Sequence, residues 1–428
     1  MLLQCQKGTI TYREECQVTV KEQPPAQALE YLLKRGVSLV EKEVDLRRML
    51  LEGNKGQPLR VKLGVDPTHH DLTIGHAVVF RKLRQFQRLG HKTVVVIGDW
   101  TARLGDPSGR EEARKSLTEE QVNKNAETYF DQFFKIVDRN QTEVHRQSEW
   151  FDKFNLGGAI KLLGYKTVAQ MLERDDFQKR YRSGVEINLA EFMYPLLQGY
   201  DSVALRSDVE IGGTDQTFNL LVGRDLQPIF GQAPQQILTV NLIVGLDGVK
   251  KMGKSLDNYI AMTAPANDMF GKLMSLPDQT MRTYFEALTD VSDEEIDEFE
   301  RKMAESSLNP RDVKLRMARE IVTEFHDETS AQEAQEAFIR QFSERKLPTD
   351  IPDVHLAEPV DIVAFLKNTG LVTSNNEART LISQKAVAIY LHGESSEEQR
   401  ITEATFVVPV QDGAIIRAGK RKYVRIKA

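Results

Sequence analysis

Two short segments of the chain carry residue types that could hold a phosphate chain. In the first, Gly64 follows an apolar run, and Thr73-Ile-Gly75-His76 precedes a stretch with helical spacing. A glycine at the end of a strand leaves the backbone bare, so a nucleotide can lie close to it. The free N–H groups at a helix start favour a phosphate, and His76 could donate a hydrogen bond to it. Taken alone the triplet is weak, because a histidine at a helix start more often has no ligand.

The second segment is Lys250-Lys251-Met252-Gly253-Lys254-Ser255. Lysines on both sides of a glycine form a mobile cationic clamp, which can neutralise the charge that grows on a departing pyrophosphate. An exposed basic turn explains this segment equally well when it is taken by itself. In the combined site, Lys251, Lys254 and His76 are expected to carry the positive charge.

The elements around these segments predict that both face one site. Residues 60–65 predict a strand, residues 74–90 a helix with one apolar face, and residues 93–97 a strand buried on both faces. Such a strand–helix–strand unit indicates a parallel sheet. The lysine segment follows another strand, predicted at residues 237–244. Open α/β sheets bind ligands at the carboxyl ends of their strands, so both segments are expected there.

The expected fold class is α/β, with a Rossmann-like parallel-sheet catalytic domain, then an all-helical domain and a small α+β domain. The expected boundaries are 1–25 for an N-terminal extension, 26–262 for the catalytic domain with a helical insertion at about 112–185, 263–345 for the helical domain, 346–355 for a linker, and 356–428 for the last domain. Capping boxes predict helix starts at Thr118, Thr167, Ser292 and Ser374. An apolar stripe from Val122 to Val137 is expected to pack in the core rather than face a partner.

Composition bounds the class of protein. The 428 residues carry a net charge of −6, which argues against indiscriminate binding of nucleic acid. No apolar run is long enough to span a membrane, and the first residues lack the pattern of a secretory signal. Cys5 and Cys16 are the only cysteines and make neither a disulfide framework nor a zinc site, so a reducing, cytoplasmic location is expected. The basic tail from Arg417 to Lys427 is either a solvated end or an RNA-binding surface.

The chain resembles a known family in several motifs. The Gly64–His76 and Lys250–Ser255 segments are similar to the HIGH and KMSKS signatures of class I aminoacyl-tRNA synthetases. The sequence between them resembles the bacterial tyrosyl-tRNA synthetases, and residues 370–382 resemble an S4 RNA-binding domain. The residues that carry the tyrosyl resemblance are Gly105-Asp106-Pro-Ser-Gly109, Tyr194-x-x-x-Gln198-x-x-Asp201 and Gly212-Gly213-Thr-Asp215-Gln216-x-x-Asn219. The likeness covers roughly Glu30 to the C-terminus.

The resemblance implies activation of tyrosine by ATP, with Mg²⁺ accompanying the ATP, followed by transfer to tRNA(Tyr). It also implies a homodimer, with an interface in the Thr118–Tyr181 region, and no membrane association. The implied tyrosine-binding residues are Lys62, Asp106, Tyr194, Gln198, Asp201 and Gln216. The implied ATP-binding residues are Gly64, Asp66, Gly75, His76, Gly213, Asp215 and Lys254. The implied catalytic residues are Thr68, Thr73, His76, Lys251 and Lys254.

Three positions depart from the family pattern. Thr73 stands where the motif usually has its first histidine, Gly253 replaces the usual serine, and Lys62 stands where many relatives carry tyrosine. We hypothesise that His69 or His70 on the adjoining turn partly covers the loss at Thr73. Two other functions stay open, a tryptophanyl-tRNA synthetase and an RNA-binding paralogue that has lost catalysis. Intact Lys251, Lys254, Asp106 and Asp201 argue against the latter.

Overall fold

The computed structural model describes residues 25–52, 54, 56–107, 117–342, 347, 351–391, 398–419 and 422–428. The extension expected at residues 1–25 therefore lies outside the described residues, apart from Pro25. Contacts divide the chain into two units. The first unit is Met1–Ala264 with Lys272–Phe325, and the second is Pro265–Gly271 with His326–Ala428. No helix among the described residues is both long and apolar enough to cross a membrane.

The first unit is built on a six-stranded sheet with the order β1-β6-β5-β2-β3-β4. The strands from β6 to β4 are parallel to their neighbours, and β1 joins the edge antiparallel to β6. This confirms the expected α/β fold with a parallel sheet. The strand bounds are β1 Val37–Glu41, β2 Arg60–Val65, β3 Lys92–Ile97, β4 Thr142–Arg146, β5 Val209–Gly213 and β6 Gln236–Val240.

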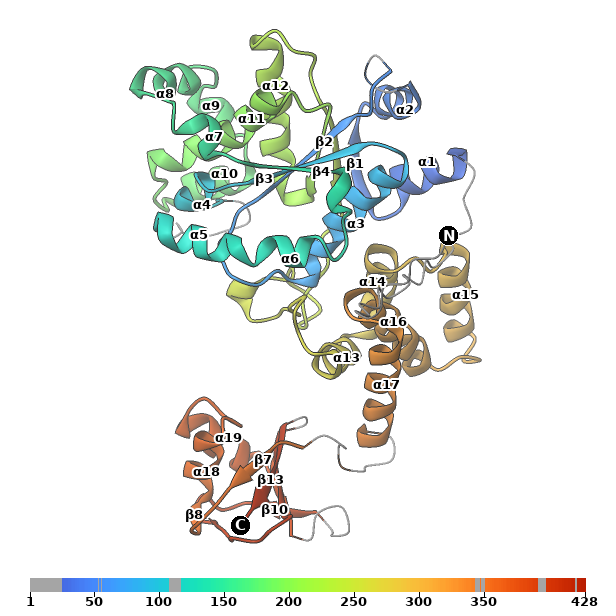
Figure 1. Ribbon diagram of the computed structural model, residues 1–428, viewed down its shortest axis with the longest axis vertical. Helices are drawn as coiled ribbons and strands as arrows, with labels where there is room; N and C mark the ends of the chain where they lie inside the picture. The colour runs from blue at the N-terminus through green and yellow to red at the C-terminus, as the bar shows by residue number, and fades with distance from the viewer. Residues whose placement is uncertain are drawn as a thin grey trace, which may run out of the picture. The chain divides into compact units, whose positions relative to one another are not determined.

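Helices cover both faces of this sheet. Figure 1 shows α11 and α12 above the strands and α3 below them. The helices that belong wholly to this unit are α1 Pro25–Lys34, α2 Glu43–Glu52, α3 Ile74–Arg88, α4 Thr101–Leu104, α5 Glu119–Glu127, α6 Tyr129–Phe133, α7 Ser148–Phe151, α8 Leu156–Leu163, α9 Val168–Met171, α10 Asp175–Ser183, α11 Met193–Leu205, α12 Thr217–Ile229, α14 Met281–Leu288, α15 Asp293–Ala304 and α16 Pro310–Phe325.

The local sequence explains most of these elements. Val94, Val95 and Val96 of β3 are at most 2 % exposed, as expected for a β-branched strand covered on both faces. The capping boxes at Thr118 and Thr167 are present, and each begins a helix. The Val122–Val137 stripe is largely buried, which confirms that it packs in the core.

Strand β6 is shorter than the 237–244 strand expected from the sequence. It ends at Val240, and Val244 instead pairs with Lys251 in an isolated bridge. Residues 245–250 then turn back, so that the Met252 N–H donates to the Ile243 carbonyl at 2.9 Å and the lysine segment runs beside residues 243–244. Tyr284 of α14 supports this turn by donating its hydroxyl to the Val244 carbonyl at 2.6 Å.

Helices α14 to α16 belong to the first unit rather than to a separate body. Arg81 on α3 bonds to Glu324 of α16 at 2.6 Å and also to Asp290, in the turn after α14. The predicted domain boundaries at residues 262 and 345 stay predictions, because the contacts divide this helical segment between the two units.

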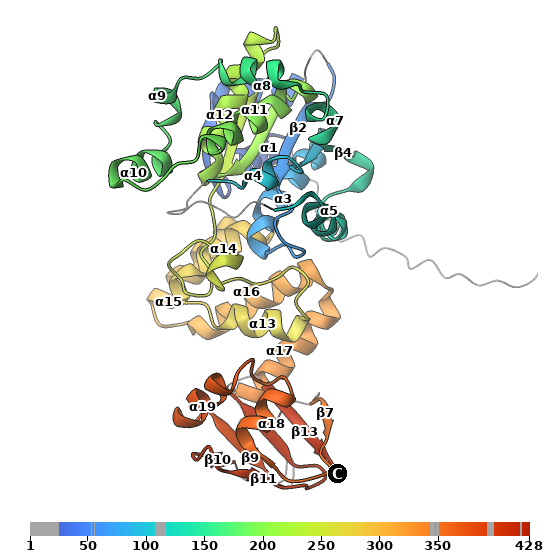
Figure 2. The same ribbon diagram turned by 90° about the vertical axis from the view of Figure 1, so that its left-hand side faces the viewer.

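The second unit combines helices with a five-stranded sheet of order β10-β9-β12-β13-β7 and a small β11-β8 pair. Figure 2 shows α18 and α19 together with these strands. Ser374 caps α19 through the Glu377 N–H, as predicted, but the Glu377 carboxylate turns to the Thr373 N–H instead. The bounds are α17 Glu328–Phe342, β7 Asp353–His355, β8 Val360–Asp361, α18 Ile362–Asn368, α19 Asn375–Ser383, β9 Val387–Tyr390, β10 Gln399–Ile401, β11 Val407–Val408, β12 Ile415–Ala418 and β13 Lys422–Lys427, with α13 Ala266–Met274 at the border between the units.

Candidate active site

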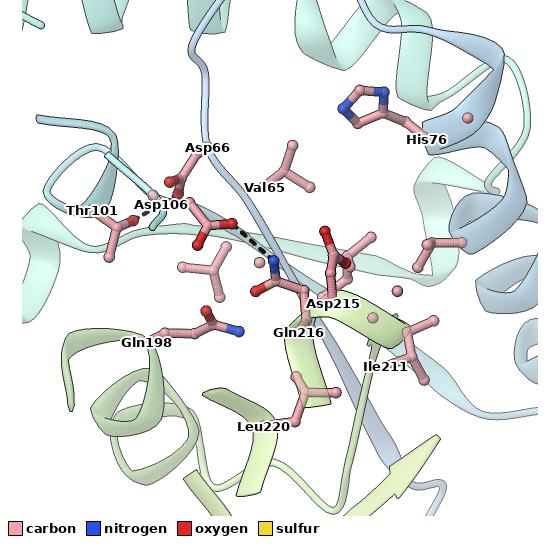
Figure 3. Close-up of a pocket in the computed structure, with 18 of the residues that line it drawn as sticks. Val65, Asp66, His76, Thr101, Asp106, Gln198, Ile211, Asp215, Gln216 and Leu220 are labelled. Carbon is pink, nitrogen blue, oxygen red and sulfur yellow. Dashed lines mark hydrogen bonds between the residues drawn. The ribbon is translucent and has the colours of Figure 1, made fainter. Parts of the chain in front are cut away.

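A cavity of about 290 Å³ opens at the carboxyl ends of β2, β3 and β5 in the first unit. Most residues predicted for the site line it, from opposite sides (Figure 3). The predicted residues in its wall are Gly64, Asp66, Thr68, Thr73, Gly75, His76, Asp106, Tyr194, Gln198, Asp201, Gly213, Asp215, Gln216 and Lys251. Lys62 and Lys254 do not line it.

Three of these side chains come from one face of α11. Tyr194, Gln198 and Asp201 are 5 %, 9 % and 1 % exposed, and the helical spacing brings all three to the same cavity. The Tyr194 hydroxyl donates to Asp66 Oδ2 at 3.0 Å. Burial raises the pKa of Tyr194 well above its ordinary value, and the charges of Asp106 and Asp66 add to this. Tyr194 therefore acts as a neutral hydroxyl group in this wall.

Asp201 is a buried carboxylate with a hydrogen bond to each oxygen. Gln147 Nε2 donates to Oδ2 at 2.8 Å, and Trp150 Nε1 donates to Oδ1 at 3.2 Å. Burial raises the pKa of Asp201 to about 7, although the nearby Lys62 ammonium and these donors act in the opposite direction. A group with this pKa can accept a hydrogen bond from a ligand as the carboxylate, or donate one as the acid.

Lys62 takes a different position from the one expected of a residue that contacts the amino acid. Its side chain is fully buried beneath the cavity and uses its donors inside the protein. The ammonium donates to the Gln198 carbonyl at 2.9 Å and to Ser202 Oγ at 2.8 Å, and it lies 2.9 Å from Glu210 Oε1. Lys62 therefore supports α11 from below. Glu210 was missed from the sequence, where its signal is a carboxylate inside an otherwise apolar strand.

Asp106 belongs to a closed ring of polar side chains at another wall. Gln216 Nε2 donates to Asp106 Oδ2 at 2.8 Å, and Asn219 Nδ2 donates to Gln216 Oε1 at 2.8 Å (Figure 3 shows the first bond). Arg174 closes the ring, with Nη1 3.0 Å from Asn219 Oδ1 and Nη2 3.4 Å from Asp106 Oδ1. The ring fixes the orientation of the Asp106 carboxylate. Its members Asn219 and Arg174 were not identified as site residues from the sequence.

The start of α3 forms the opposite wall. Thr73 is its N-cap, and the Thr73 N–H donates to His76 Nδ1 at 3.2 Å. A nitrogen that accepts this bond carries no proton, so neutral His76 carries its proton on Nε2. Figure 3 shows the His76 imidazole across the cavity from Gln198.

His76 does not supply the positive charge that we expected of it. Although solvent reaches the ring through the cavity, its enclosure lowers the pKa below the ordinary 6.5, and the charges of Lys254 and Lys251 lower it further. The imidazole is therefore neutral at pH 7 and acts as a hydrogen-bond donor. Among the described residues of this wall, the positive charge comes from the lysine segment.

The lysine segment meets the helix start directly. Met252 packs beside Gly75, where a Cβ atom would lie 3.6 Å from Met252 Cβ, an ordinary contact distance. Lys251 Nζ lies 2.7 Å from Asp215 Oδ2 at the end of β5. At Gly64 a Cβ atom would meet no atom within 4 Å, because it would point into open space. The predicted convergence of the two segments is thus present.

The turn between β2 and α3 places Asp66 and Thr68 in the cavity wall but not the two histidines. Thr101 Oγ1 donates to Asp66 Oδ1 at 2.7 Å, and the Thr68 N–H donates to the Asp66 carbonyl at 2.8 Å (Figure 3 shows the first bond). His69 and His70 are exposed and are not part of this wall. The geometry therefore gives no support to the idea that either of them replaces a histidine at position 73.

Comparison with known proteins identifies the relatives of this chain. Residues 54–343 match the family described as tRNA synthetases class I (W and Y), and residues 344–426 match the SYY-like C-terminal domain of tyrosine–tRNA ligases. The tyrosine–tRNA ligase of Thermotoga maritima is 48% identical over 402 residues, which cover 94% of this chain and 98% of the relative. The tyrosine–tRNA ligase of Dehalococcoides mccartyi is 48% identical over 397 residues, covering 92% and 97%.

Solved structures share the fold. A C-terminally truncated mitochondrial tyrosyl-tRNA synthetase from Aspergillus nidulans matches with a TM-score of 0.60 at 21% identity, over 74% of this chain and 94% of that chain. A tyrosyl-tRNA synthetase from Archaeoglobus fulgidus, complexed with L-tyrosine, matches with a TM-score of 0.58 at 20% identity, over 72% and 99%.

Proposed function

This chain belongs to the class I tRNA synthetases (W and Y) and, among them, to the tyrosine–tRNA ligases, and we propose that its cavity carries out their reaction. L-Tyrosine is activated by ATP to tyrosyl-adenylate, and the tyrosine is then transferred to the 3′ end of tRNA(Tyr). The observation that carries the proposal is the meeting of two walls in one cavity. The α11 wall can hold an amino acid, and the α3 and lysine-segment wall can hold a triphosphate.

The amino-acid wall offers partners for both ends of tyrosine. We place the phenol at Asp201, whose carboxylate can accept the phenolic proton while Gln147 and Trp150 hold it in place. The ammonium lies between Asp106, Tyr194 and Gln198. Phenylalanine in this position would bring no donor to Asp201 and would lay an apolar ring edge against this buried carboxylate, which would lose one of its hydrogen bonds. The acceptor at Asp201 therefore selects tyrosine.

The phosphate wall needs no covalent intermediate with the protein. The substrate carboxylate attacks the α-phosphorus of ATP, pyrophosphate leaves, and the protein positions the reactants and neutralises charge. Gly64, Asp66, Gly213 and Gln216 surround the adenylate, with Asp215 accepting from the ribose hydroxyls. Gly75 lies in the cavity wall at the start of α3, where the backbone can approach the nucleotide. Residues that act on the phosphates or the adjoining ribose are Thr68, Thr73, His76, Lys251 and Lys254.

Mg²⁺ is expected to enter with ATP and to neutralise its phosphates. Among the described residues, no group of three or more His, Cys, Asp or Glu side chains is placed to hold a metal ion.

The second unit is proposed to contact tRNA through its helices. Lys367 and Arg379 lie with Asn368 and Asn375 around a surface hollow beside α18 and α19. Part of the basic tail is neutralised instead, since Arg417 pairs with Glu398 at 3.0 Å and Arg425 with Asp353 at 3.7 Å. Helices α18 and α19 are therefore the better candidates for phosphate contacts.

Helices α14 to α17 are proposed to read the anticodon.

A homodimer is proposed on the evidence of an exposed apolar surface. Seven large apolar side chains between α8 and the turn after α10 are each 40–79 % exposed: Leu156, Ile160, Leu163, Val168, Tyr181, Val185 and Leu189. These residues partly overlap the Thr118–Tyr181 region expected to form the interface. Sedimentation of the whole chain, compared with a Leu156→Asp/Ile160→Asp variant, tests it. A cytoplasmic location also remains a proposal, which rests on the sequence.

Tyrosine-dependent exchange between ATP and pyrophosphate tests the central proposal. The chain is expected to exchange label with tyrosine and not with tryptophan or without an amino acid. Exchange with tryptophan alone would indicate a tryptophanyl enzyme, although the relatives and the C-terminal domain favour tyrosine. Absence of exchange with any amino acid, from a folded chain that binds tRNA, would indicate a paralogue without catalysis.

A further inference from the structure

A buried carboxamide lies directly behind the lysine segment. Asn258 is 5 % exposed, and its Oδ1 accepts a hydrogen bond from the Gly253 N–H at 2.9 Å. Its Nδ2 donates to Asp247 Oδ2 at 2.7 Å and to the Lys251 carbonyl at 3.2 Å. One side chain thus bonds to the backbone at both residues 251 and 253. Lys251 is itself one of these two residues, and Lys254 directly follows Gly253.

The turn at residues 245–250 holds this carboxamide from the other side. Asp247 Oδ1 accepts from the N–H groups of Val249 and Lys250, at 2.8 Å each, while its Oδ2 takes the Asn258 donor. The Val249 N–H and the Asn258 side chain are the largest causes that lower the pKa of Asp247, so the acceptor stays ionised. Asn258 therefore connects a fixed turn to the lysine segment.

Gly245 provides a second observation: the space where its Cβ atom would lie is occupied by Asn258. A Cβ atom at Gly245 would lie 2.3 Å from both Cγ and Nδ2 of Asn258, and 2.4 Å from its backbone carbonyl oxygen. Such an approach is far inside van der Waals contact, so any larger residue would displace the side chain. The glycine thus leaves room for Asn258 to reach the segment.

The bond to Gly253 has a particular value in this chain. Glycine at position 253 loosens the segment, because it has more backbone freedom than any other residue. A hydrogen bond from its N–H to a buried acceptor removes part of that freedom. The Lys251 ammonium at the same time rests on Asp215, within reach of the cavity.

We propose that Asn258 is a positioning residue for the activation step, which holds the backbone at residues 251–253 so that Lys251 and Lys254 reach the phosphates of ATP. The inference rests on the proposed function of the cavity. Asn258 does not line the cavity, and it acts on the reaction through the two lysines. Misplacement of a charged group by about 1 Å can lower a rate by about 100-fold.

The test compares Asn258→Ala and Asn258→Asp with the unaltered chain. Both variants are expected to lower the single-turnover rate of tyrosyl-adenylate formation by about 10- to 100-fold, while the Kd for tyrosine without ATP stays within about twofold. The aspartate keeps the shape but lacks both N–H donors and faces Asp247, so it should be no better than alanine. Asn376→Ala, at an exposed position on α19, is the matched control and is expected to leave the rate unchanged.

Gly245→Ala is a second test, which displaces the side chain and the backbone carbonyl of Asn258 without substituting the residue. It is expected to lower the activation rate in the same way, and the double variant with Asn258→Ala should be no slower than the slower single variant. If the Asn258→Ala variant forms tyrosyl-adenylate as fast as the unaltered chain, the inference is wrong. Equal losses in tyrosine binding and activation would overturn it too, because they indicate general damage. Failure of the unaltered chain to exchange with tyrosine would instead refute the proposed function.

Discussion

The Lys62 ammonium lies 2.9 Å from the Glu210 carboxylate, and neither side chain has any exposed surface. The two residues face each other across the β2–β5 pairing, directly beneath α11. Removing one charge leaves the other buried without the opposite charge beside it, which costs about 3–5 kcal/mol. Glu210→Gln is therefore expected to lower the free energy of unfolding by about that amount. Chemical denaturation of the whole chain, following the unfolding transition of the first unit, measures it.

Two controls distinguish the cost of the unpaired buried charge from the cost of removing a carboxylate elsewhere. Glu305→Gln removes a partner from the Arg301–Glu305 pair, whose side chains are 59% and 54% exposed. This change is expected to cost at most about 1 kcal/mol. Lys62→Met combined with Glu210→Gln should recover much of the stability lost in Glu210→Gln. A double variant as unstable as the single one would show that packing, and not the unpaired charge, causes the loss.

Tyrosine binding is expected to weaken as pH falls through about 7, the pKa to which burial raises Asp201. Above this pH the carboxylate accepts the phenolic proton in a charge-assisted bond, and below it the protonated acid is a weaker acceptor. The difference of about 1 kcal/mol between charged and neutral hydrogen bonds predicts a rise in Kd of about fivefold. Calorimetric titration of tyrosine without ATP, from pH 5.5 to 8.5, measures it. Asp201→Asn should abolish the dependence, and an equal slope in that variant would exclude Asp201 as its source.

Lys251→Met is expected to lower the rate of adenylate formation by about 100- to 1,000-fold, because a preorganised charge is lost where charge develops in the transition state. The Kd for tyrosine should change little, since Lys251 faces Asp215 and the phosphate wall. The neighbouring Lys250 is exposed and is a matched control in the same turn. Stopped-flow measurement of the single turnover distinguishes the two variants. Equal losses from Lys250→Met and Lys251→Met would point to the general charge of the turn.

The sequence was sufficient to predict the main frame of the site. Helical spacing placed Tyr194, Gln198 and Asp201 on one face, and the rule for parallel sheets placed the two motif segments at the same edge. Both predictions depend on local periodicity and on the order of elements, which a single chain displays directly.

The partners of Lys62 and the charge of His76 could not be predicted in the same way. Glu210 is opposite Lys62 only because β5 lies next to β2 in the sheet, and one sequence does not reveal this order of strands. His76 is neutral because the cavity wall partly desolvates it and the charges of Lys254 and Lys251, remote in the sequence, lower its pKa further. Both properties arise from tertiary neighbours, whereas the family resemblance suggested a tyrosine contact for Lys62 and the residue type suggested a charge for His76.

Thr73→His restores the residue usual at this position of the family motif, and we expect it to change the activation rate by less than about tenfold. Thr73 is 1 % exposed and caps α3, and its Oγ1 lies 2.9 Å from His76 Nδ1. A histidine there would lose a favourable cap, at a cost of about 1 kcal/mol in stability. Beside Lys251 and Lys254 it would also be held neutral, as His76 is, so it would add a donor but no charge.

The same rate measurement decides whether His69 or His70 compensates for Thr73. Both side chains lie outside the cavity wall, so His69→Ala/His70→Ala is expected to leave adenylate formation unchanged. A loss in this double variant that Thr73→His repairs would restore the compensation hypothesis despite their position. A gain of several orders of magnitude from Thr73→His alone would refute both that hypothesis and the prediction here. It would mean that the neutral threonine limits the phosphate wall, and that Lys251 and Lys254 do not suffice to neutralise the triphosphate.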